Sequence, residues 1–173
     1  MLKEKITSDI KQAMIEKQEL LLLVLRGINA AIHNKEIEKR TKLSKTSAFA
    51  EASADKEKMA KLEEQSKLSD EEIIDVISSE AKKRRDSILE FGKGGRQDLV
   101  DKETKELEII KKYLPEQMSE DAIKEIVKKA IEETGAAGPK DTGKVMAKIM
   151  PQVKGKADGG VVSKIVGELL KGE

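Results

Sequence analysis

The sequence of 173 residues contains no cysteine and no tryptophan, and it has only two phenylalanines and one tyrosine. Without cysteine, disulfides, thiolate nucleophiles and thiolate metal sites are excluded. Because β-sandwiches and β-barrels draw on aromatic and β-branched residues, an aromatic content of 2% argues against them. Proline and glycine are also scarce, with 3 and 12 residues, so little of the chain can be linker.

Long apolar runs are missing as well. The longest is Leu20 to Leu25, which is far too short to cross a bilayer. The first 19 residues carry charges throughout, so we expect no signal peptide and no membrane contact. Together with the lack of cysteine, this predicts a cytoplasmic protein. The net charge of +1 provides no overall field for a polyanion, so nucleic-acid binding would need a local patch.

What the chain does contain is charge of both signs, 39% of its residues, mixed with Ala, Leu and Ile at helical spacing. This is the composition of amphipathic helices with solvated outer faces, and it predicts an all-α fold. We expect an N-terminal helical hairpin or bundle over residues 1–114 and a small three-helix domain over residues 118–173. Pro115 marks the boundary, since it disfavours helix in the residue before it. Residues 42–67 hold no sustained apolar stripe and are predicted to be an exposed insertion.

Three local signals refine these expected helices. Ser69 and Glu72 are spaced as a capping box at a helix start. Three glycines within residues 92–95 predict a tight turn between two helices. Pro151 predicts a bend or stop in the second helix of the C-terminal domain.

Groups with catalytic potential are few. His33 is the only histidine, and it lies on an expected helix without a partner at metal-ligand spacing, which favours a surface or packing role. Carboxylates such as Glu103 and Glu108, near Lys105, are expected on solvated faces in weak ion pairs. We therefore predict no catalytic residue, no cofactor and no metal.

Basic residues offer two candidate anion sites. One is the glycine turn, where Lys93 and Arg96 flank flexible backbone N–H groups at a helix start. It follows a helix and lacks a P-loop ending, which favours a plain hairpin turn with incidental phosphate contact. The other is a C-terminal set of lysines that could face a phosphate backbone. This set, called here the C-terminal lysines, comprises Lys140, Lys144, Lys148, Lys154, Lys156 and Lys164. A solvated lysine face without any ligand explains the same pattern, and the pattern alone leaves both alternatives open.

Several motifs in order resemble the YqeY-like protein family. They are Lys83-Arg84-Arg85-Asp86-Ser87-Ile88, Gly94-Gly95-Arg96-Gln97-Asp98-Leu99, Tyr113-Leu114-Pro115-Glu116-Gln117-Met118-Ser119, Gly143-Lys144-Val145-Met146 and Lys154-Gly155-Lys156-Ala157-Asp158-Gly159. The resemblance extends to Leu25-Arg26 and Lys35-Glu36-Ile37-Glu38, so that it takes in nearly the whole chain. The segment 43–67 looks longer than in the usual family member.

The resemblance implies a C-terminal domain similar to the tail of the B subunit of glutamyl-tRNA(Gln)/aspartyl-tRNA(Asn) amidotransferase. In that enzyme the tail is a helical domain that contacts tRNA, while other domains carry out the transamidation. This favours phosphate contacts by the C-terminal lysines. The tail is commonly labelled with carbon–nitrogen ligase activity that uses glutamine as amido-N donor. No residue here fits that reaction, so we expect the label to be inherited and the chain by itself not to be an enzyme.

Two functional hypotheses follow. The first is a non-catalytic module that binds tRNA or other RNA by its backbone and shape. The second is an adaptor that docks on a protein partner in a tRNA-charging or amidotransferase complex.

Overall fold

The computed structural model describes residues 1–45 and 56–171. Within these residues all regular structure is helical, which confirms the all-α prediction. The chain divides into two compact units, Met1–Tyr113 (unit 1) and Leu114–Glu173 (unit 2), and each is described by itself. The elements are α1 (Leu2–Ile15), α2 (Glu19–Ser44), α3 (Lys56–Ser66), α4 (Asp70–Lys93), α5 (Gln97–Lys111), α6 (Glu120–Thr134), the short 3₁₀ helix η2 (Pro139–Asp141), α7 (Thr142–Val153) and α8 (Gly159–Lys171).

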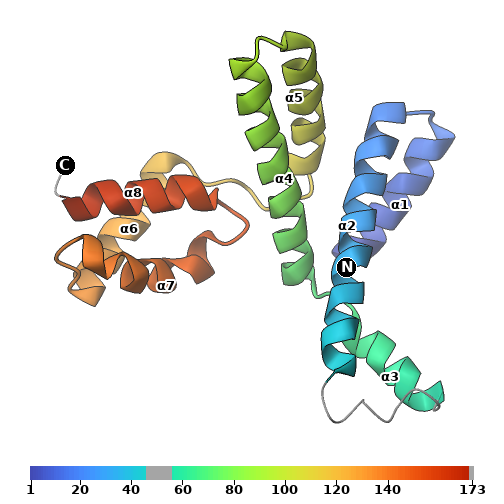
Figure 1. Ribbon diagram of the computed structural model, residues 1–173, viewed down its shortest axis with the longest axis horizontal. Coiled ribbons are helices and arrows are strands. Elements are labelled where there is room, and N and C mark those ends of the chain that lie inside the picture. Colours follow the sequence, from blue (N-terminus) through green and yellow to red (C-terminus); the bar gives the residue numbers. More distant parts are fainter. Residues whose placement is uncertain (46–55, 172–173) are drawn as a thin grey trace. The chain divides into compact units, whose positions relative to one another are not determined.

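Unit 1 consists of two helical hairpins, α1–α2 and α4–α5, with α3 beside the C-terminal part of α2 (Figure 1). Helix α2 is central, because it contacts α1, α3, α4 and α5. Its buried side chains Leu25, Ile28 and Ile32 form a stripe at helical spacing and are at most 1% exposed. Ile6, Ile73, Ile77 and Ile110 from α1, α4 and α5 are equally buried.

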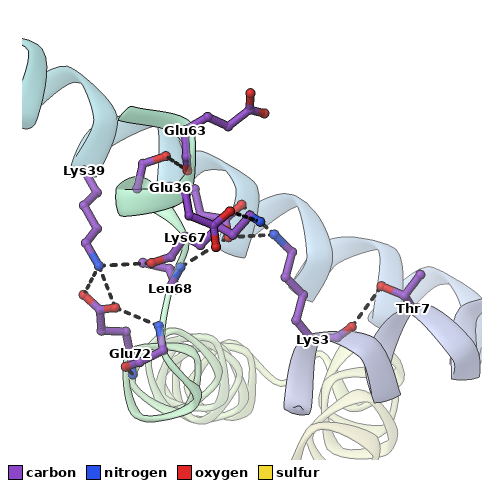
Figure 2. Close-up of polar contacts among 11 residues, drawn as sticks. Lys3, Thr7, Glu36, Lys39, Glu63, Lys67, Leu68 and Glu72 are labelled. Atoms are coloured by element: carbon purple, nitrogen blue, oxygen red, sulfur yellow. Dashed lines mark hydrogen bonds and ion pairs between the residues drawn. The ribbon is translucent and has the colours of Figure 1, made fainter. Parts of the chain in front are cut away.

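Helix α4 begins at the predicted capping box. The Ser69 hydroxyl accepts a hydrogen bond from the Glu72 backbone N–H at 3.2 Å, and the Glu72 carboxylate accepts one from the Ser69 N–H at 2.8 Å. Lys39 of α2 adds a bidentate ion pair to Glu72, with Nζ–O distances of 2.9 and 2.8 Å (Figure 2). The cap therefore also attaches the start of α4 to α2.

In the described part of the segment 42–67, which was predicted to be an exposed insertion, the chain is largely helical and most side chains are exposed. Helix α2 continues to Ser44, and α3 places Leu62 and Ser66 at 4% and 1% exposure. The burial of these two residues could not be predicted from periodicity, because one leucine and one serine make no apolar stripe. Residues 46–55 of the segment lie outside the described residues.

Unit 2 is a three-helix bundle with one apolar core. Helix α6 starts at Ser119, whose hydroxyl accepts from the Ala122 N–H, and ends at Gly135, whose φ of 61° is left-handed. Pro151 causes no stop: α7 continues to Val153, since a proline near a helix end removes only one of the last hydrogen bonds. The buried core comprises Ile123, Val127, Ala130, Val145, Ile149, Val153, Val162, Ile165, Val166 and Leu170.

Candidate nucleic-acid interface

The first three C-terminal lysines follow one another along η2 and α7. Gly138 precedes η2 in an extended conformation, and Pro139 starts it with a pre-set φ. In α7, Val145 and Ile149 are fully buried, which leaves the neighbouring lysines Lys144 and Lys148 exposed to solvent. Lys140 lies one turn earlier and is also exposed. A spacing of four residues places successive Cα atoms about 6 Å apart along the axis of an α-helix.

The α7 lysines are not free cations. Lys144 lies 3.0 Å from Asp141, and Lys148 lies 3.0 Å from Glu133 of α6. The hydrogen bond from Lys144, with a second one from the Ala137 N–H, lowers the pKa of the Asp141 carboxyl below its ordinary value. Both lysines are thus partly neutralised by an ion pair with a carboxylate of unit 2.

The remaining C-terminal lysines lie in the α7–α8 turn and on α8. Lys154 and Lys156 flank Gly155. The φ of Gly155 is 72°, a left-handed conformation that glycine adopts without steric strain. The turn is tied to the start of unit 2, since the Met118 N–H donates to the Lys156 carbonyl at 2.7 Å. The Lys156 side chain extends into solvent. On α8, Lys164 lies 3.8 Å from Glu168.

The glycine turn between α4 and α5 belongs to unit 1. Gly95 has a left-handed φ of 68°, as a tight helix-to-helix turn requires. Lys93 is paired with Glu90 at 2.7 Å, and Arg96 binds Asp98 with both Nε and an Nη. The hydrogen bond from Arg96 lowers the pKa of Asp98. Both cations of this candidate anion site are therefore engaged by neighbouring carboxylates.

Groups for catalysis do not converge in the described part of the chain. His33 is exposed on α2, and among described residues no cluster of His, Asp or Glu could hold a metal ion. A hollow of roughly 850 Å³ lies between α2 and α4. Its charged lining is largely paired internally, through Lys35–Glu38, Lys39–Glu72 and Lys83–Glu80.

Unit 1 contains two buried charge clusters that were not predicted from the sequence. Glu36 of α2 is 5% exposed, accepts two hydrogen bonds from Lys3 of α1 at 2.6 and 2.7 Å, and accepts a third from the Leu68 N–H (Figure 2). A signal was available, because Glu36 follows Ile32 by four residues in the buried stripe of α2.

The second cluster lies between α4 and α5. Arg84 Nε is 2.9 Å from Glu106 and 3.4 Å from Glu103. Glu106 is 4% exposed, and the Glu103 side chain is 16% exposed. The prediction that Glu103 is a solvated surface carboxylate is therefore wrong, because it faces α4 rather than water.

Comparison with known proteins adds the family. The model of the Yqey-like protein family matches residues 48–170. A relative from Pyrenophora tritici-repentis is 30% identical over 96% of this chain and 79% of its own length. One from Lachancea thermotolerans is 36% identical over 61% of this chain, and the match spans only 44% of that relative.

Both relatives carry the name altered inheritance of mitochondria protein 41, mitochondrial, as does one from Saccharomyces cerevisiae that is 34% identical over 61% of this chain and 44% of its own length. These mitochondrial relatives contradict the cytoplasmic localisation predicted from the sequence. The lack of cysteine does not specify a compartment, which explains the error. In the described residues no helix is both long and apolar enough to span a bilayer. Because the family model matches most of this chain, the chain belongs to the YqeY-like protein family.

Proposed function

We propose that this chain is a non-catalytic helical module that binds the RNA backbone, with tRNA as the preferred RNA. The observation that carries the proposal is the row of exposed lysines on η2 and α7, continued by Lys156 in the next turn. The choice of tRNA rests on the resemblance of unit 2 to the tail of the amidotransferase B subunit.

The chemistry of the lysines suits phosphate rather than base recognition. An ammonium group is a compact point charge without the planar fork that arginine offers to base edges. Unit 2 contains ten lysines, no arginine and no tryptophan, tyrosine or phenylalanine on which bases could stack. Contacts of this kind position a module on an A-form backbone by shape and carry little sequence preference.

The proposal is tested by fluorescence anisotropy with labelled total tRNA at two salt concentrations. We expect salt-dependent binding that weakens strongly in a variant with four lysines of unit 2 changed to alanine, Lys144, Lys148, Lys156 and Lys164. The matched control changes four exposed lysines of unit 1, Lys11, Lys82, Lys102 and Lys105. It removes the same charge, and it should bind almost as the unaltered protein does.

Equal loss in the two variants would show that bulk charge, not unit 2, binds the RNA. No binding at low salt would reject the RNA hypothesis and favour the adaptor, whose protein partner would then be sought after nuclease treatment. Conversion of a mischarged tRNA by the purified chain with glutamine and ATP would contradict the non-catalytic part of the proposal.

A further inference from the structure

Five of the C-terminal lysines fall into two groups by their surroundings. Lys144, Lys148 and Lys164 each have a carboxylate within 3.0 to 3.8 Å, from Asp141, Glu133 and Glu168. Lys140 and Lys156 are exposed and form no ion pair within the described residues. Since unit 2 contains ten lysines and ten acidic residues, its charge balances overall.

We propose that Glu133, Asp141 and Glu168 compete with phosphate for these lysines, so that unit 2 binds RNA by exchanging internal carboxylates for phosphates. This inference rests on the proposed function and concerns its regulation. The ion pairs therefore weaken RNA binding. A polyanion gains binding energy from the paired lysines only where its phosphates displace several of the carboxylates at once.

The geometry of the Lys148–Glu133 pair makes the exchange feasible. The pair joins two helices across the surface of unit 2, and both side chains are about half exposed, at 50% and 58%. Exposed pairs are weak and screened by salt, so a phosphate can replace the carboxylate without disturbing the core. The core beneath is formed by buried apolar side chains only.

The salt dependence of binding distinguishes exchange from simple attraction. A free lysine that neutralises a phosphate releases its counterion and adds about 0.7 to 0.9 to the slope of log K against log salt. A lysine that is already paired with a carboxylate adds little net positive charge, so it contributes less to this slope. We therefore expect the slope for the unaltered protein to be smaller than about 0.7 for each lysine whose loss weakens binding.

The test measures the tRNA affinity and salt slope of Glu133→Gln in the full chain. Removing the competing charge should raise the affinity by roughly two- to fivefold, the range for an exposed pair, and should steepen the slope by up to about 1. The matched control is Glu132→Gln, a neighbouring exposed residue of α6 with the same loss of charge and no ion pair within the described residues. Its affinity should change less.

A second pair of variants isolates Lys148. In a Lys148→Ala background, Glu133→Gln should lose most of its effect, because the lysine that it frees is gone. If Glu133→Gln and Glu132→Gln strengthen binding equally, or if the gain persists without Lys148, the exchange is refuted while the RNA function stands. If no variant binds tRNA at all, the proposed function fails, and the exchange fails with it.

Discussion

Unit 1 and unit 2 are both helical, but they place their charges differently. In unit 1, Glu36 and Glu106 are about as buried as the leucines around them, and each has a basic partner on another helix. In unit 2 the buried residues are apolar, and the ion pairs lie in the solvent-exposed layer. The same composition of Glu and Lys thus serves two purposes.

This difference in burial indicates which charges of the chain are available for binding. A buried carboxylate with a partner holds two helices in one register, since leaving either group unpaired is costly. An exposed pair contributes little to stability and can be exchanged for another ligand. We therefore expect changes at the buried charges of unit 1 to alter folding and changes at the exposed charges of unit 2 to alter binding.

The largest effect should come from the apolar core of unit 2. Ile149 is fully buried, and its change to alanine should cost about 2 to 5 kcal/mol. A unit of this size has little stability to lose, so residues 114–173 should exchange amide hydrogens rapidly while unit 1 stays protected. Ile149→Val, which removes one methylene, should have a much smaller effect. Equal loss of protection in both units would show that they do not fold separately.

An intermediate effect is expected for the buried carboxylate of unit 1. Glu106→Ala leaves Arg84 with Glu103 alone and should cost about 1 to 3 kcal/mol, as measured by urea unfolding. Glu108→Ala on the same helix changes an exposed carboxylate and should cost under about 0.5 kcal/mol. If the two variants unfold alike, the buried cluster does not stabilise unit 1.

The smallest effect concerns pH at the start of α4. The hydrogen bond from Lys39 and the cap at Ser69 lower the pKa of Glu72 in the folded state. The stabilisation is therefore present above the unfolded pKa of about 4.3 and is lost as the pH falls through the lower folded value. Because the pair is partly exposed, it contributes less than about 1 kcal/mol.

Glu72→Gln should accordingly melt slightly below the unaltered protein at pH 7, and the difference should shrink as the pH falls through the folded pKa of Glu72. Glu71→Gln removes the same charge at the neighbouring position of the first helical turn, without Lys39 as partner, and it controls for the helix dipole. A difference between Glu72→Gln and the unaltered protein that does not shrink at acidic pH would show that the lost charge is not its cause.

Local signals allowed much of the fold to be predicted. The capping box at Ser69 and the glycine turn with its left-handed Gly95 lie where their patterns place them. These features depend on residues within one helical turn, so tertiary context does not override them. At Pro151, where a bend or a stop was predicted, the helix does not stop, because a proline close to the helix end removes only one of the last hydrogen bonds.

The candidate site shows where such prediction ends. The spacing of Lys140, Lys144 and Lys148 could be read from the sequence, since helical periodicity places them on successive turns. The pairing of Lys148 with Glu133 could not, because the two residues lie on different helices. Likewise, an acidic residue in an apolar stripe, such as Glu36, indicates a buried charge without naming its partner.

By itself, the sequence determined the helical class, the helix starts and the apolar faces, because each depends on residues a few positions apart. Only the tertiary structure decided which charges are buried, which lysines are neutralised and how α3 packs on α2. Those outcomes depend on the distance between side chains of different helices, which no pattern along the chain specifies.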